Sequence, residues 1–144
     1  MNATRAAAAG LVATGAMTAL LLVEPSIGLP KIAIGQILST SLGLASARLS
    51  IGPAIGWVID FLVGVVLALI YAAVFDRRLP GKPLVRGVLF GVLVFVGAQL
   101  AFMPMVGGGV FSNGDVELLA GSLLGHVVYG GLTGWIYGES AGTV

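Results

Sequence analysis

The sequence has 144 residues, of which 58% are apolar and only 9% are charged, against roughly 25% charged in soluble domains. A mean hydropathy of +1.07 excludes a soluble globular protein, and a net charge of +1 excludes the basic surface that binds nucleic acid. Cysteine is absent, which excludes disulfides, thiolate nucleophiles and cysteine-ligated metals. We therefore expect residues 1–144 to form one all-α transmembrane domain that contacts the lipid bilayer.

The first expected span covers residues 6–23, with Arg5 before it and Glu24-Pro25 after it. Its length is close to the roughly 20 residues that cross a bilayer. A signal peptide is the alternative, but no small-x-small cleavage site follows Val23. Alanine and glycine fill one face of this segment, and such faces let helix backbones approach closely.

Residues 31–48 differ in composition from the expected spans, because polar residues alternate with apolar ones between Lys31 and Arg48. This spacing is typical of an amphipathic helix in the membrane interface. A re-entrant segment and a plain surface loop remain open.

Three further spans are expected over residues 53–75, 87–105 and 118–137. Trp57 and Tyr71 stand near the two ends of the second span, as interfacial anchors do. The fourth span carries a repeated four-residue glycine step, which predicts close helix packing. The glycines of this step are Gly121, Gly125, Gly130 and Gly134.

The distribution of Lys and Arg predicts the orientation of four spans. The N-terminus and the middle connection carry Arg5, Arg77, Arg78, Lys82 and Arg86, whereas the other side carries Lys31 and Arg48. The positive-inside rule then places both termini in the cytoplasm. Glu24 is expected outside or at the outer interface.

Two patterns recur along the chain and predict two similar helical hairpins. They are Asp60-x3-Gly64-x6-Tyr71, which matches His126-x3-Gly130-x6-Tyr137, and Arg5-x4-Gly10, which matches Arg86-x4-Gly91. Halves of equal orientation would be related by an axis along the membrane normal. Coincidence in a glycine-rich apolar sequence is the alternative.

Helix geometry places one polar residue of each span at a similar depth, which predicts an intramembrane polar layer. Its members are Thr18, Asp60, Gln99 and His126. The layer has three interpretations: a structural Asp60–His126 pair that fixes helix register, a proton or ion site, and a haem or metal site. The last is the weakest, because one histidine and one aspartate supply only two ligands. We expect no cofactor, and no catalytic triad or phosphate loop can be assembled.

The segments LVATGAMTALLL, GLPK, FMPMVGGGVF and LLGHVVYGGLTGWIYG resemble an uncharacterised family of small four-helix bacterial membrane proteins, of the YagU-like or domain-of-unknown-function type. The resemblance implies a four-helix fold in the bacterial cytoplasmic membrane and no established activity. Such sequences often place a histidine near position 60, so Asp60 departs from the pattern and weakens a bis-histidine haem site further.

The function that we expect is that of a non-enzymatic accessory or assembly subunit, which packs against larger membrane subunits or against copies of itself. The alternative is a small proton- or ion-coupled transport unit that uses Asp60 and His126. Lipid-facing glycine stripes would favour the first function, and a cavity reaching both residues would favour the second.

Overall fold

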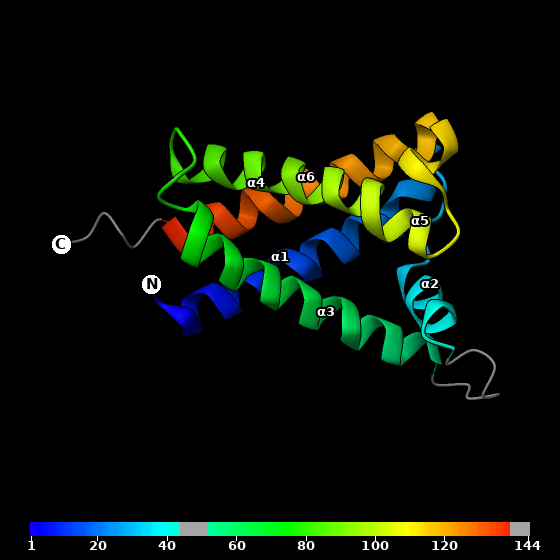
Figure 1. Ribbon diagram of the computed structural model, residues 1–144, viewed down its shortest axis with the longest axis horizontal. Helices are drawn as coiled ribbons and strands as arrows, with labels where there is room; N and C mark the ends of the chain where they lie inside the picture. Colours follow the sequence, from blue (N-terminus) through cyan, green and yellow to red (C-terminus); the bar gives the residue numbers. More distant parts are fainter. Residues whose placement is uncertain (44–51, 139–144) are drawn as a thin grey trace.

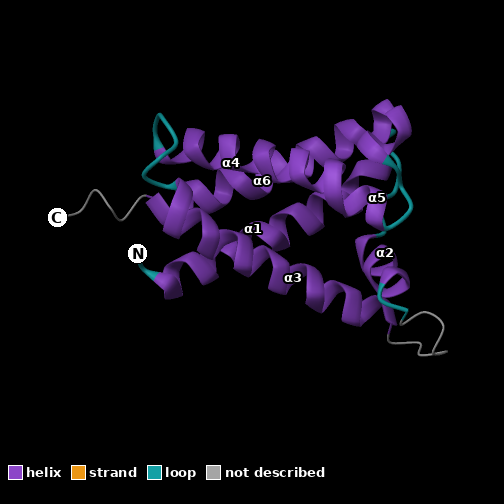
Figure 2. Ribbon diagram, viewed as in Figure 1, coloured by secondary structure: helices purple, strands orange, loops and turns teal. Residues whose placement is uncertain are grey.

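The computed structural model describes residues 1–43 and 52–138, and every regular element in these ranges is helical (Figure 2). The long helices are α1 (Ala3–Val23), α3 (Gly52–Ile70), α4 (Pro83–Gly97) and α6 (Val116–Gly138), and shorter α-helices are α2 (Ile34–Ser41) and α5 (Met103–Met105). Turns of 3-10 helix are η1 (Glu24–Ile27) and η5 (Val110–Gly114), and π-helical turns are η3 (Tyr71–Phe75) and η4 (Ala98–Phe102).

Four helices of the described chain are long and apolar enough to cross a membrane, which confirms the expected number of long apolar helices. They are Ala3–Ile27, Gly52–Phe75, Pro83–Met105 and Val116–Gly138. Side-chain caps determine where two of these helices begin. The Asn2 side chain caps α1 by accepting from the Arg5 amide at 3.0 Å, and Asp115 caps α6 by accepting from the Glu117 and Leu118 amides.

The helices pack in the order α3, α1, α6, α4, with α2 against α3. Arg5, the connection between α3 and α4, and Gly138 lie at one end, here called the basic end, and α2 and α5 lie at the other, the α2 end (Figure 1). At the basic end α3 and α4 come together, since the Phe90 ring lies 5.2 Å from those of both Tyr71 and Phe75. Toward the α2 end the two helices draw apart (Figure 1).

Glycines make the closest helix crossings. A Cβ atom on Gly130 would lie 2.5 Å from the amide nitrogen and 2.6 Å from the Cα atom of Gly91. Gly134 faces Gly87 in the same crossing, and Gly10 of α1 faces Gly64 of α3. Backbones can approach this closely only where side chains are absent.

The other two glycines of the α6 step face side chains of the first helix. A Cβ atom on Gly125 would make ordinary contact, at 3.4 Å, with Met17, whereas one on Gly121 would lie 2.9 Å from Oε2 of Glu24. All four glycines of the step are buried.

Tyr71 is fully buried and packs in the aromatic core with Phe90 and Tyr137. Its expected place as an interfacial anchor is therefore wrong. The residue falls on the same helical stripe as Gly64 and Ala68, both buried, so it points at the neighbouring helices and not at the membrane surface.

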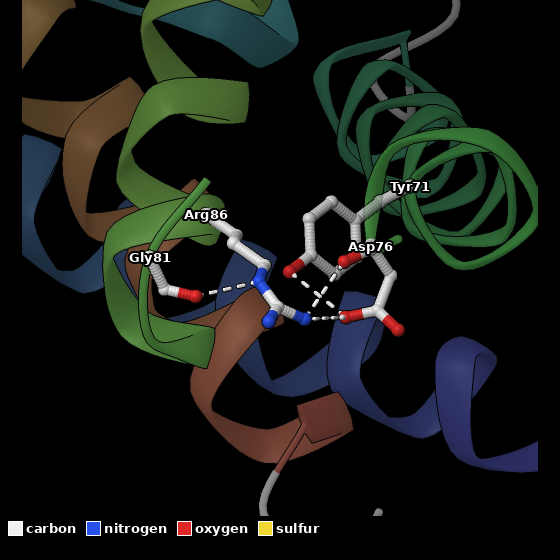
Figure 3. Close-up of polar contacts among 4 residues, drawn as sticks. All are labelled: Tyr71, Asp76, Gly81 and Arg86. Atoms are coloured by element: carbon white, nitrogen blue, oxygen red, sulfur yellow. Dashed lines mark hydrogen bonds and ion pairs between the residues drawn. The ribbon is translucent and has the colours of Figure 1, made fainter. Parts of the chain in front are cut away.

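Arg86 joins the ends of α3 and α4 (Figure 3). Its Nε donates to the Gly81 carbonyl at 2.7 Å, and its Nη1 donates to the Asp76 carbonyl at 2.8 Å and lies 3.7 Å from Oδ1 of Asp76. The Tyr71 hydroxyl points at the same carboxylate, at 3.5 Å. A planar guanidinium with several donors suits this arrangement better than an ammonium.

The segment expected at residues 31–48 contains α2, whose Gly35 packs on Gly56 and Trp57 of α3. Residues 44–48 of that prediction lie outside the described residues.

Candidate functional site

A cavity of about 450 Å³ lies among the long helices, toward the α2 end. One wall comes from α1 and α6, the flanks come from α3 and from α4 with η4, and α2 covers one end. This volume falls in the range of pockets that bind small molecules.

Most of the lining is aliphatic or aromatic, and a few polar side chains interrupt it. The polar side chains are Thr14, Asp60, Gln99, Ser122, His126 and Tyr129. An apolar pocket with a few polar groups fixes the orientation of an amphiphilic ligand.

Among the described residues, Asp60 is the only acidic side chain on the cavity wall. It stands one helical turn from Gly64, on the face of α3 that packs inward, and it is half-buried. Within the described chain, its carboxylate has no hydrogen bond and no ion pair. A carboxylate at this depth without a partner is a candidate site for a proton or a cation.

The tautomer of His126 follows from its hydrogen bond. Its Nδ1 lies 2.7 Å from the carbonyl oxygen of Ser122. A carbonyl can only accept, so Nδ1 carries the hydrogen, and in the neutral ring Nε2 is an acceptor. The Phe95 ring packs edge-on against the imidazole with centroids 5.9 Å apart and holds the ring in place.

Gln99 lies in the π-helical turn η4, is 1% exposed and has both ends of its amide satisfied. Its Nε2 donates to Oγ of Ser122 at 3.3 Å, and its Oε1 accepts from Oγ of Ser112 at 3.0 Å. π-helical turns often occur at functional sites. This network ties η5 and α6 to η4 and fixes one flank of the cavity.

Sequence reasoning missed Tyr129 and Ser122. The Tyr129 hydroxyl donates to the Gly64 carbonyl at 2.6 Å and so connects α6 to α3 across the cavity. The sequence contained information that could have identified Tyr129, because Tyr129 stands three residues after His126 and therefore on the same side of the helix.

The structure brings Asp60, Gln99 and His126 of the predicted layer to one cavity. Thr18 does not line it, and its hydroxyl oxygen is buried without a partner in the described ranges. The predicted direct pair of Asp60 and His126 is not formed, because His126 turns Nδ1 to its own helix and no bond joins the two side chains. No group of three or more metal-ligating side chains occurs among residues 1–43 and 52–138.

Glu24 was expected outside or at the outer interface, and this placement stays a prediction. Its side chain is fully buried against Gly121. Periodicity could not show this, because Glu24 begins the 3-10 turn η1, which departs from the α-helical period of α1.

Comparisons with known proteins reveal a family and no function. No curated protein and no solved structure matches the chain. A family model matches residues 1–143, and the chain therefore belongs to the family of unknown function DUF6789.

Proposed function

We propose that this protein is a small, non-enzymatic transport unit of the membrane, whose cavity binds a compact apolar amine and exchanges it for a proton. One observation carries the proposal. Asp60 and His126 lie on the wall of a largely apolar cavity of about 450 Å³, and the Asp60 carboxylate has no partner among the described residues.

The chemistry of the lining selects the class of ligand. The Asp60 carboxylate and Nε2 of a neutral His126 are both acceptors, so the complementary ligand group is a donor. A positive charge suits this group best, because a carboxylate in a poorly hydrated site gains most from an opposite charge. The aliphatic lining suits an apolar body on that ammonium group.

Access is proposed from the side on which α3 and α4 draw apart (Figure 1). Gly97 lines the cavity on α4, and a Cβ atom there would meet no atom within 4 Å. An amphiphilic amine could enter from the bilayer by this route, and a proton released by Asp60 would balance its charge.

The finer topology is part of the proposal: a bacterial cytoplasmic membrane, both termini cytoplasmic and two similar hairpins. The hairpin design is supported by matching contacts at matching positions. Gly10 faces Gly64 in the first pair of helices, and Gly91 faces Gly130 in the second, as the recurring sequence patterns predict.

An accessory subunit that packs on larger partners stays a prediction, as does a homo-oligomer. Lipid-facing glycine stripes would favour a missing partner. The α6 glycines are instead buried within the chain, and so is Gly10 of α1. For this reason we place the transport unit first.

Binding can be tested with 1-adamantylamine, a compact apolar amine, on protein in lipid nanodiscs. A ligand that binds only the folded state raises its stability by about 2.7 kcal/mol at a hundredfold excess over Kd. We expect the amine to raise the melting temperature of wild-type protein and to lose this effect in Asp60→Asn. The matched anion, 1-adamantanecarboxylate, should give no shift. Equal shifts from both compounds in both proteins would indicate partitioning into lipid and refute the site.

A glycine pair provides the control for cavity volume. Gly97→Leu fills the cavity and should abolish the amine effect, whereas Gly15→Leu places the same side chain where a Cβ also meets nothing within 4 Å, away from the cavity. Proteoliposomes with an internal pH dye should then show amine-driven proton movement for wild type and Gly15→Leu only. Amine binding without proton movement would leave a binding protein and refute transport.

A further inference from the structure

Glu24 is a buried acid that the proposed amine site does not use. It is the first residue of η1, directly after α1, and its side chain is 0% exposed. It does not line the cavity. Both carboxyl oxygens are buried and have no hydrogen-bond partner among the described residues.

Gly121 of α6 leaves the space that this carboxyl group occupies. A Cβ atom on Gly121 would lie 2.9 Å from Oε2 and 3.3 Å from the carboxyl carbon of Glu24. The acid is therefore enclosed in the contact between α1 and α6, here called the α1–α6 seam, at its α2 end.

The charged groups of the neighbouring elements do not compensate an ionised Glu24. On α6 and at its cap, Glu117 and Asp115 carry the same sign and are exposed. The His126 ring is bonded to its own helix, and Lys31 is exposed. Within the described ranges none of them forms an ion pair with Glu24. The carbonyl groups at the end of α1 add partial negative charge.

An ionised carboxylate buried in this way is strongly destabilising, since neither water nor a counter-charge compensates it. We propose that Glu24 is a second intramembrane proton site, occupied as a neutral carboxylic acid at neutral pH and independent of amine binding. A proton is the ligand that fits, because the described residues form no group of three or more acidic, histidine or cysteine side chains that could hold a metal ion.

The enclosure by Gly121 gives this site a conformational consequence. The proton leaves only when the α1–α6 seam opens at its α2 end and water reaches the carboxylate. Loss of the proton therefore favours separation of α1 from α6 in this region.

Infrared spectroscopy of the full chain in lipid bilayers at neutral pH tests the proposal. The chain has six acidic side chains, so one substitution changes a simple spectrum. Subtraction of the Glu24→Gln spectrum from wild type should leave the C=O stretch of a carboxylic acid, which shifts in D₂O. The same subtraction with Glu117→Gln, an exposed control, should leave carboxylate bands. Carboxylate bands in the Glu24 difference would overturn the proposal.

A second measurement tests the proposal without the Glu24→Gln variant, in case that variant does not fold. In Asp60→Asn protein, Glu24 is the only buried acidic side chain of the described spans, because Glu117 at the start of α6 is exposed, and the acid band should persist well above the pH of about 4 at which exposed carboxyl groups ionise. Disappearance of the band together with the exposed groups would refute the assignment. Neither experiment depends on the amine, so the failure of one proposal is distinguishable from the failure of the other.

Discussion

The crossing of α4 and α6 allows a sharp comparison between two adjacent glycines. In Gly130→Ala the new Cβ would lie 2.5 Å and 2.6 Å from backbone atoms of Gly91, whereas optimal heavy-atom contacts are about 3.5–4.0 Å. The helices must therefore separate by about 1 Å, because backbone atoms cannot rotate away. A gap of that size forfeits about a quarter to a half of each dispersion contact in the crossing, and overpacking costs typically about 1–3 kcal/mol. We expect a loss of about 2–3 kcal/mol.

Gly131→Ala is the matched control, since Gly131 is also buried and lies on the same helix. Its Cβ would meet only the ends of the Leu84 and Val88 side chains, both at 3.4 Å. We expect a change within about 0.5 kcal/mol. Unfolding of both variants in mixed micelles, followed by circular dichroism, measures the difference. Equal stabilities would show that α4 and α6 do not cross at Gly130, and the packing derived from this crossing would then be wrong.

Two other predictions follow from single contacts, and a third follows from the distribution of Lys and Arg. Tyr129→Phe removes the hydroxyl that donates to the Gly64 carbonyl and should lower the free energy of unfolding by about 0.5–1.5 kcal/mol, measured in the same micelles; no loss would mean that water replaces the bond. Gly121→Ala should destabilise the chain by pressing on the Glu24 carboxyl, and the shorter Glu24→Ala side chain in the same protein should recover part of the loss; a double-mutant cycle without coupling would separate the two residues. Reporters fused after Arg78 and at the C-terminus should read cytoplasmic and one near Asn113 external, whereas an external C-terminus would contradict the proposed orientation.

Hydropathy was sufficient to predict the four long helices, and helical period accounts for the buried stripes on two of them. Gly64, Ala68 and Tyr71 share the inward side of α3, and Gly130 and Gly134 share that of α6, because residues spaced by three or four stay on one face. The same rule shows why Tyr71 is a core residue, although its place near the end of a span is typical of an interfacial anchor.

The details of the candidate site could not be predicted in this way. Period shows which face a residue occupies and not how far that face lies from its neighbour, so the cavity between the Asp60 and His126 faces was not foreseeable. The bond of His126 Nδ1 to the Ser122 carbonyl depends on a side-chain rotamer, and the burial of Glu24 depends on the turn at η1. The spacing of residues along the sequence shows neither the His126 hydrogen bond nor the burial of Glu24.

The distribution of small residues explains where the cavity around Asp60 and His126 forms in the bundle. Toward the α2 end, Gly121 and Gly125 keep α6 close to α1, so the wall formed by these two helices stays closed. On the other side, α4 contacts η3, which follows α3, through large rings at the basic end, where Phe90 meets Tyr71 and Phe75. A Cβ atom on Gly97 would meet no atom of another element within 4 Å. Helices held together at one end and unpaired at the other diverge, and the entry to Asp60 that we propose lies between α3 and α4.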